Sequence, residues 1–379
     1  MIKQFPDDSD SIAGDTIYAA TAKATPVDAD KIGYWDSVSG LFRSMTWANV
    51  TATLLTYFTD KGIGAYNDIL NGNFQIAQRG TSFAAPATGA YDLDGWVNNN
   101  VSAAVFTVAQ VAGSVAGRMC RQVTITTADA AIAAGEFVMD SHRMVGYDIA
   151  KYVGNTFTVS FRAKFPVTGI HCVSLRNIGT AGASDRSYIH EINVASADTW
   201  AEYSFVVTGG LPTDGTWNYT TGRGLYLGIA HACGSTYQTT PDAWNTGYFF
   251  GTANQVNDLA TVGNVWALEE VKLNLGTVPT QHQISEAEML VRCQQRYEVG
   301  TARRDLQGTN TAAESCQIIF KTTKLITPTM SLTNTAANNY NATPNTVQIT
   351  TEGFAVYHIG TATGAAAFVD SWTATSEPA

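Results

Sequence analysis

The sequence predicts a mainly β protein, in which an antiparallel jelly-roll-like sandwich is preceded by an N-terminal hairpin-helix module and followed by a small C-terminal β-domain. Three observations predict it. Only 14% of the 379 residues are charged, so uncharged Thr, Ser, Asn and Gly must supply much of the polar surface. Short runs of alternating apolar and polar residues recur, separated by Gly, Asn and Asp. The length also exceeds what one hydrophobic core usually reaches, so we expect several domains.

The first part of the chain predicts an attachment segment and a docking module. Residues 1–30 are polar with few apolar anchors, which is typical of an arm that needs a partner to order it. In 31–45, two apolar runs flank a Ser/Gly turn and predict a β-hairpin. Thr46 then caps a helix that continues to about Asp60. We assign the hairpin and helix together to a module over 31–68.

Four apolar residues of this predicted helix are candidates for an oligomer interface, because they recur at a spacing of three or four: Trp47, Val50, Leu54 and Tyr57. So narrow a stripe suits a seam between helices better than a helix that lies on a broad core. An isolated hairpin and helix bury little surface alone. We therefore expect this module to associate with copies of itself or with a partner.

The remainder of the chain divides into a sandwich, a connector and a terminal domain. Residues 69–277 carry strand-like runs such as Thr156–Phe161 with no helices between them, which indicates an antiparallel sandwich. Ser285–Glu288 is a capping box that starts one short helix in the connector, 278–300. The alternation then returns in 301–379, a small β-domain whose modest core favours self-association.

Charge and cysteine usage exclude several classes of function. The net charge is −10 and Lys and Arg do not cluster, so we expect no nucleic-acid partner. The five cysteines form no C-x-x-C pair, which is typical of thiols kept free in a reducing cytoplasm. The N-terminus lacks the apolar stretch of a signal peptide, and no run is long enough to span a membrane. We expect neither secretion nor membrane insertion.

Catalytic and metal-binding patterns are sparse. Asp92 and Asp94 could share one face, but Asp-Gly-Trp before a strand predicts a turn in which Asp bonds to its own backbone. His171 and Cys172 suggest a base and a thiol, yet adjacent strand residues point to opposite faces. The six histidines show no metal-ligand spacing. We predict no catalytic residue, no metal and no cofactor.

Aromatic residues gather in the stretch 213–250, among Asn, Thr, Asp and Gly. The candidates for glycan binding are Trp217, Tyr219, Trp244 and Tyr248. Aromatic faces can stack on the C–H surface of a sugar while neighbouring Asn and Asp take its hydroxyls. The alternative interpretation is packing in the sandwich core or at a subunit interface, which the large burial of aromatic residues favours.

Several segments resemble parts of bacteriophage tail-fibre and related virion proteins. Asn71–Thr81, followed by Asp94–Trp96, resembles the opening of a sandwich domain that recurs in these proteins. Glu286–Tyr297 resembles the helix that follows that sandwich, and Phe368–Glu377 is similar to the last strand. Ala24–Lys31, together with Thr46–Asn49, resembles a module common in fibre shafts. Together these segments are distributed over most of the chain.

The same opening is also similar to that of sugar-binding jelly-roll modules. These modules start Asn-Gly-x-Phe-Glu, and Trp266–Leu273 would be their final strand here. They often hold a structural calcium between the two ends. Gln75 stands where the modules have Glu, which removes one charged ligand from such a site. The alternative is that Asn71–Gln75 forms only a turn into the first strand.

These resemblances imply a phage fibre-type structural protein, not an enzyme, that attaches the virion to the host surface by binding a glycan. They imply a homotrimer, joined to other virion proteins through its N-terminal segment and assembled in the host cytoplasm. Two alternatives stay open. One is a head or tail decoration fibre without a specific receptor, and the other is a glycan-depolymerising tailspike enzyme.

Overall fold

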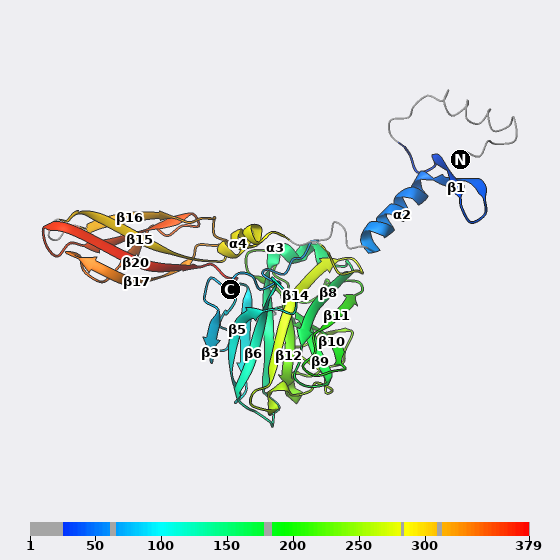
Figure 1. Ribbon diagram of the computed structural model, residues 1–379, viewed down its shortest axis with the longest axis horizontal. Coiled ribbons are helices and arrows are strands. Elements are labelled where there is room, and N and C mark those ends of the chain that lie inside the picture. Colours follow the sequence, from blue (N-terminus) through cyan, green and yellow to red (C-terminus); the bar gives the residue numbers. More distant parts are fainter. Residues whose placement is uncertain (1–25, 61–65, 178–183, 282–283, 309–312, 379) are drawn as a thin grey trace. The chain divides into compact units, whose positions relative to one another are not determined.

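The computed structural model describes residues 26–60, 66–177, 184–281, 284–308 and 313–378. The chain forms two compact units, Met1–Lys61 and Gly62–Ala379. Strands dominate the described residues and pair almost entirely antiparallel, so the predicted mainly β fold class is confirmed (Figure 1). Most of the predicted arm, residues 1–25, lies outside the described residues.

The first unit contains the predicted hairpin and helix. Strands β1 (Lys31–Asp36) and β2 (Leu41–Thr46) pair antiparallel around a turn in which the Asp36 carboxylate accepts hydrogen bonds from the backbone N–H groups of Val38 and Ser39. Helix α2 spans Trp47–Asp60. The Thr46 hydroxyl caps this helix, because it accepts a hydrogen bond from the Asn49 nitrogen at 3.2 Å.

The second unit begins with a sandwich of two six-stranded antiparallel sheets (Figure 1). The first sheet runs in the order β13 (Trp244–Thr246), β10 (Arg186–Val194), β9 (Gly169–Arg176), β12 (Arg223–Cys233), β7 (Phe137–Val145), β4 (Trp96–Val101). The second runs β11 (Ala201–Val207), β8 (Phe157–Lys164), β14 (Val265–Leu275), β6 (Met119–Thr127), β5 (Val105–Ala112), β3 (Ser82–Ala84). The short helices are α3 (Gly146–Ile149), η1 (Ala150–Tyr152), η3 (Ser235–Tyr237) and η4 (Asp258–Ala260).

The main core lies between these two sheets and takes alternate residues of their strands. In β12, for example, Leu225, Leu227 and Ile229 are fully buried in it. Tyr226 therefore lies on the opposite, outer face of the first sheet. This alternation decides which side chains of the first sheet can meet a ligand.

A short helix and a second β-domain follow the sandwich. Helix α4 spans Glu286–Gln294, and the Ser285 hydroxyl accepts a hydrogen bond from the Glu288 nitrogen at 3.2 Å, as the capping box predicts. Its residues Met289 and Cys293 pack against Leu70 and Ile76 of the sandwich.

The C-terminal β-domain consists of two three-stranded antiparallel sheets. Their strands, in sheet order, are β15 (Tyr297–Gly308), β20 (Gly364–Thr375), β17 (Thr329–Asn338), then β16 (Ala313–Ile319), β19 (Gly353–Ile359), β18 (Asn345–Val347). The domain begins at Tyr297, before the predicted boundary at 301, because Tyr297 pairs with Thr375 at the end of β20. Its core contains Phe354, Phe368 and Trp372.

Candidate functional site

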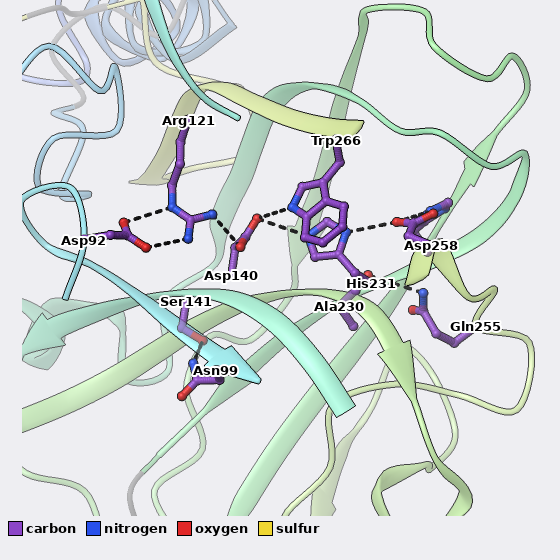
Figure 2. Close-up of polar contacts among 11 residues, drawn as sticks. Asp92, Asn99, Arg121, Asp140, Ser141, Ala230, His231, Gln255, Asp258 and Trp266 are labelled. Atoms are coloured by element: carbon purple, nitrogen blue, oxygen red, sulfur yellow. Dashed lines mark hydrogen bonds and ion pairs between the residues drawn. The ribbon is translucent and has the colours of Figure 1, made fainter. Parts of the chain in front are cut away.

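A connected group of buried titratable side chains lies inside the sandwich. Figure 2 shows a chain of contacts from Asp92 through Arg121, Asp140 and His231 to Asp258. The Arg121 guanidinium lies 2.6 Å from Asp92 Oδ2 and 2.5 Å from Asp140 Oδ1. His231 Nε2 lies 3.1 Å from Asp140 and His231 Nδ1 lies 3.0 Å from Asp258. All five residues are at most 1% exposed, so none of them can meet a ligand from solvent.

Alternating charge holds this network together. Burial alone would raise the pKa of Asp140, but the Arg121 guanidinium and the His231 ring outweigh it and hold that pKa below its usual range. Burial would likewise lower the pKa of His231, but Asp140 and Asp258 outweigh it and raise that pKa. Because Arg121 belongs to the second sheet and Asp140 to the first, the network joins the two sheets.

The candidate catalytic groups considered from sequence are committed to other contacts. Asp92 accepts from the Leu93 nitrogen at 2.6 Å. Asp94 and Gly95 form the predicted turn, but the Asp94 carboxylate accepts from Gln78 at 2.8 Å instead of bonding to its own backbone, so that part of the prediction is wrong. His171 points inward to Asp258, whereas Cys172 packs in a separate cluster beyond the main core. Burial raises the pKa of the Cys172 thiol to about 11, which disfavours a thiolate nucleophile.

The four aromatic candidates divide into two pairs. Trp217 and Trp244 meet edge to face at 5.7 Å and pack against the main core. Their indole N–H groups donate to the backbone oxygens of Asp214 and Gly210, at 2.8 and 2.9 Å. These contacts fit the packing interpretation, but both residues are only half-buried, and a glycan contact for them stays a prediction. Tyr219 and Tyr248 are 41% and 47% exposed, and a glycan contact for them stays a prediction.

The four interface candidates of helix α2 differ in their exposure to solvent. Trp47 and Val50 are half-buried within the described part of the first unit. Leu54 and Tyr57 are 47% and 54% exposed. The second half of the helix therefore presents apolar side chains that the described residues of this unit do not cover.

The segment that resembles the opening of sugar-binding modules forms a turn. Asn71 closes it, because its side chain donates to the oxygens of Ile76 and Asp94, at 2.8 and 3.1 Å, and accepts from the Ile76 nitrogen. Gln75 donates to the Gly117 oxygen instead of facing a metal. No group of three or more His, Cys, Asp or Glu side chains is arranged to hold a metal ion in the described residues.

A cluster of arginines and tyrosines lies on the outer face of the first sheet. Arg143 of β7 pairs with Tyr226 of β12, and Tyr226 pairs with Arg176 of β9, so the three form a row across neighbouring strands. We define the arginine–tyrosine cluster as this row together with nearby members on the same face: Arg143, Arg176, Arg223, Tyr91, Tyr226 and Tyr248.

Ring contacts join the members of the arginine–tyrosine cluster. The Arg176 Cζ atom lies 4.9 Å from the ring centre of Tyr226 and 4.2 Å from that of Tyr248. Arg143 and Arg223 lie 5.5 and 5.8 Å from the Tyr226 ring. Arg143 also lies 5.1 Å from Tyr91. Three guanidinium groups therefore surround one tyrosine ring, within the range of cation–π attraction.

These three arginines have hydrogen-bonding capacity that the protein does not use. The Nε atoms of Arg143, Arg176 and Arg223 are buried and have no hydrogen-bond partner. Nowhere in the described chain does a carboxylate lie within salt-bridge distance of them. Arg176 is only 4% exposed, and burial lowers its pKa, an effect that Tyr248, Tyr226 and Asp185 offset only in part.

A cavity of about 270 Å³ on the outer face of the second sheet offers a contrast. Its lining includes the charged residues Arg118, Arg162, Glu202, Glu270 and Lys272. Here each cation has a carboxylate partner, at 3.7 Å for Arg118–Glu270, 3.4 Å for Arg162–Glu202 and 3.2 Å for Lys272–Glu270. This cavity therefore lacks the uncompensated charge of the arginine–tyrosine cluster.

Sequence reasoning noted Tyr226 and Tyr248 as part of the aromatic stretch but missed the three arginines. Arg143 and Arg176 lie 33 residues apart in the chain numbering, and strand register alone brings both next to Tyr226. A local signal did exist, since Arg143 and Arg176 are the arginines of two largely buried strands. It could not show that they share a face.

Comparisons with known proteins find distant similarity in structure alone. No protein-family model matches the sequence, and no curated protein matches it. The family 11 carbohydrate-binding module of a cellulosomal cellulase from Clostridium thermocellum is 10% identical, with 53% of this chain and 98% of that one covered at a TM-score of 0.30. A putative sugar-binding protein from Bacteroides thetaiotaomicron is 12% identical, covering 55% and 100%, at 0.36. The enzymatically active domain of bacteriophage CBA120 tailspike protein 4 is 14% identical, covering 51% and 21%, at 0.28.

Similarity at these TM-scores carries no inference about function, so the candidate site rests on the geometry above. In the described residues, no helix is both long and apolar enough to cross a membrane.

Proposed function

We propose that this chain is a fibre-type structural protein of a phage virion, and that it attaches the particle to the host surface by binding a glycan at the arginine–tyrosine cluster. The observation that carries the binding part is the row Arg143–Tyr226–Arg176, with its unpaired guanidinium Nε atoms. Tyr226 is buried at 7% exposure, so the 47% exposed ring of Tyr248 beside it offers the face for a sugar ring, and guanidinium groups donate several hydrogen bonds in fixed directions. The virion part is supported by the resemblance of residues 71–81 and 286–297 to phage fibre proteins.

The proposal assigns binding, not catalysis, to the sandwich. Asp92 and Asp94, the carboxylates considered as an acid/base pair, are buried and bonded within the protein. The proposal also places the protein in the virion, assembled in the host cytoplasm, with its N-terminal segment contacting other virion proteins.

Two exposed tyrosines allow a sharp test of the binding surface. We expect Tyr248→Ala to weaken binding to polysaccharide extracted from candidate host envelopes by about tenfold or more, as loss of a contact at the centre of an interface does. Tyr219→Ala is the matched control, because Tyr219 is similarly exposed, at 41% against 47%, and is not a member of the cluster. Binding isotherms on immobilised polysaccharide measure both.

Either of two results would contradict the proposal. One is wild-type protein that binds none of the extracts. The other is a larger loss for Tyr219→Ala than for Tyr248→Ala, which would move the surface to the predicted aromatic stretch. Unchanged melting temperatures must accompany both variants, so that a loss of binding is not a loss of folding.

The proposed assembly is a homotrimer formed through helix α2. It is supported by the exposed apolar side chains of Leu54 and Tyr57, since burying such surface stabilises an interface. We expect light scattering to give three times the 40.5 kDa chain mass, and the double variant Leu54→Ser, Tyr57→Ser to shift the protein toward monomer. Val38→Ser, at a 95% exposed turn, is the control that should keep the trimer. A monomeric wild-type protein at micromolar concentration would contradict the assembly.

A further inference from the structure

The arginines of this protein divide sharply by their partners. Those with a carboxylate within salt-bridge distance are Arg43, Arg79, Arg118, Arg121, Arg162, Arg186, Arg292, Arg303 and Arg304. In the described chain, Arg143, Arg176, Arg223 and Arg296 have none. Three of these four surround Tyr226, and Arg296 donates to the backbone oxygen of Arg143. The arginines without a carboxylate partner thus gather at one place.

This gathering is unexpected from composition. The chain has 32 Asp and Glu residues against 22 Lys and Arg, so acidic partners are abundant. Burying a cation without a partner is costly, and like charges held close together repel each other. Arg176 is nevertheless 4% exposed beside Arg143 and Arg223 in the same cluster. A bound anion would supply the missing countercharge.

The donors also have the chemistry of an oxyanion site. Guanidinium groups bind carboxylates through paired N–H donors, and the half-buried Arg143 and Arg223 bring such groups to the edge of the cluster, beside the buried Arg176. Tyr248 adds an exposed ring directly beside the buried Arg176, at 4.2 Å from its Cζ atom. A sugar ring on Tyr248 would place a substituent near Arg176.

We infer that the arginine–tyrosine cluster binds an acidic saccharide, with a carboxylate of the sugar held by the guanidinium groups of Arg143, Arg176 and Arg223. This inference rests on the proposed function, because it names the class of glycan that the same surface takes. Sulfated polysaccharide presents a related oxyanion, and the experiment separates it from a carboxylated one.

The test compares each carboxylated polymer with a form of the same polymer that has lost its carboxylates, and with a sulfated polymer. Each carboxylated polymer of a panel (polygalacturonate, alginate, a glucuronate polymer and polysialic acid) is paired with its carboxyl-reduced form, and dextran sulfate serves as a sulfated polymer. We expect the full-length protein to bind at least one carboxylated member, and to bind its reduced form at least tenfold more weakly. Dextran sulfate should bind more weakly than that carboxylated member at physiological salt, because nonspecific charge attraction is screened.

Variants locate the binding to the cluster. Arg143→Gln and Arg223→Gln should each weaken binding to the carboxylated polymer by about tenfold, and by a larger factor than they weaken any residual binding to the reduced form. Arg162→Gln is the matched control, because Arg162 is also half-buried on an outer sheet face, where it pairs with Glu202. Melting temperatures within a few degrees of the wild-type value show that the variants fold.

The outcomes distinguish the inference from the proposed function. Equal binding to the carboxylated and reduced forms, preferential binding to dextran sulfate, or wild-type binding by both cluster variants would overturn the carboxylate inference. Each of these would leave glycan binding standing. Binding only to neutral host polysaccharide would likewise overturn the carboxylate inference and leave the proposed glycan binding in place. No binding to any polysaccharide would contradict both the inference and the proposed function.

Discussion

Replacing Arg121 by methionine should destabilise the sandwich by about 3–5 kcal/mol, which is the usual effect of removing one partner of a buried ion pair. The Arg121 guanidinium contacts both Asp92 and Asp140, and all three side chains are at most 1% exposed. Its loss leaves two carboxylates in the interior without their main countercharge. Chemical denaturation followed by tryptophan fluorescence measures the change, since Trp266 donates to Asp140 within the same network.

Arg118→Met is the matched control for this prediction. Arg118 lies just before the same strand, but it is 39% exposed and its ion pair with Glu270 spans 3.7 Å. Exposed pairs contribute about 0–1 kcal/mol, so this variant should stay within about 1 kcal/mol of the wild type. The double variant Arg121→Met, Asp92→Asn should recover part of the loss by removing one buried charge. Equal stability of the two single variants would show that the network contributes little.

Replacing Lys324 by methionine should destabilise the C-terminal β-domain by a similar amount, about 3–5 kcal/mol. The Lys324 ammonium pairs with Glu298 and donates to the Gln294 oxygen at 2.6 Å, and both charged side chains are at most 1% exposed. Without Lys324, the Glu298 carboxylate keeps only the Lys321 backbone N–H. Calorimetry, which can resolve separate transitions of separate domains, measures the effect.

Lys321→Met tests whether any lysine close to Glu298 stabilises the C-terminal β-domain, or only the one that pairs with its carboxylate. Lys321 is exposed, and its bond to Glu298 comes from the backbone, so the variant should change stability by no more than about 0.5 kcal/mol. Adding Glu298→Gln to Lys324→Met should restore part of the loss, because an amide costs less to bury than an unpaired carboxylate. A Lys324→Met protein as stable as the wild type would contradict the prediction.

Local patterns predicted the elements of this fold well. The capping residues Thr46 and Ser285 each accept the hydrogen bond expected of them, three residues along the chain. Alternation predicted the strands and their antiparallel pairing, because inward and outward positions differ in polarity every second residue. The turn at Asp94 and Gly95 was also predicted, but the Asp94 carboxylate accepts from Gln78 and not from its own backbone.

Local patterns did not predict the buried network of Arg121, Asp140 and His231. These three residues are separated by tens of residues in the chain. The strand β6 begins Met-Cys-Arg-Gln-Val-Thr-Ile, so alternation places Arg121 on the same face as Val123 and Ile125, but nothing local shows which carboxylate would pair with it. Only the facing sheet, which supplies Asp140, makes its burial tolerable.

The sequence by itself determined the mainly β class, the order of hairpin, helix and β-domains, and the turns and caps between them. These features depend on residues within a few positions of one another. The tertiary structure decided which arginines are paired and which are not. Arg143, Tyr226 and Arg176 meet only because strands β7, β12 and β9 are neighbours in one sheet, in a particular register. Register depends on the packing of the whole sheet against its partner, and a one-residue slip would have turned these side chains into the core.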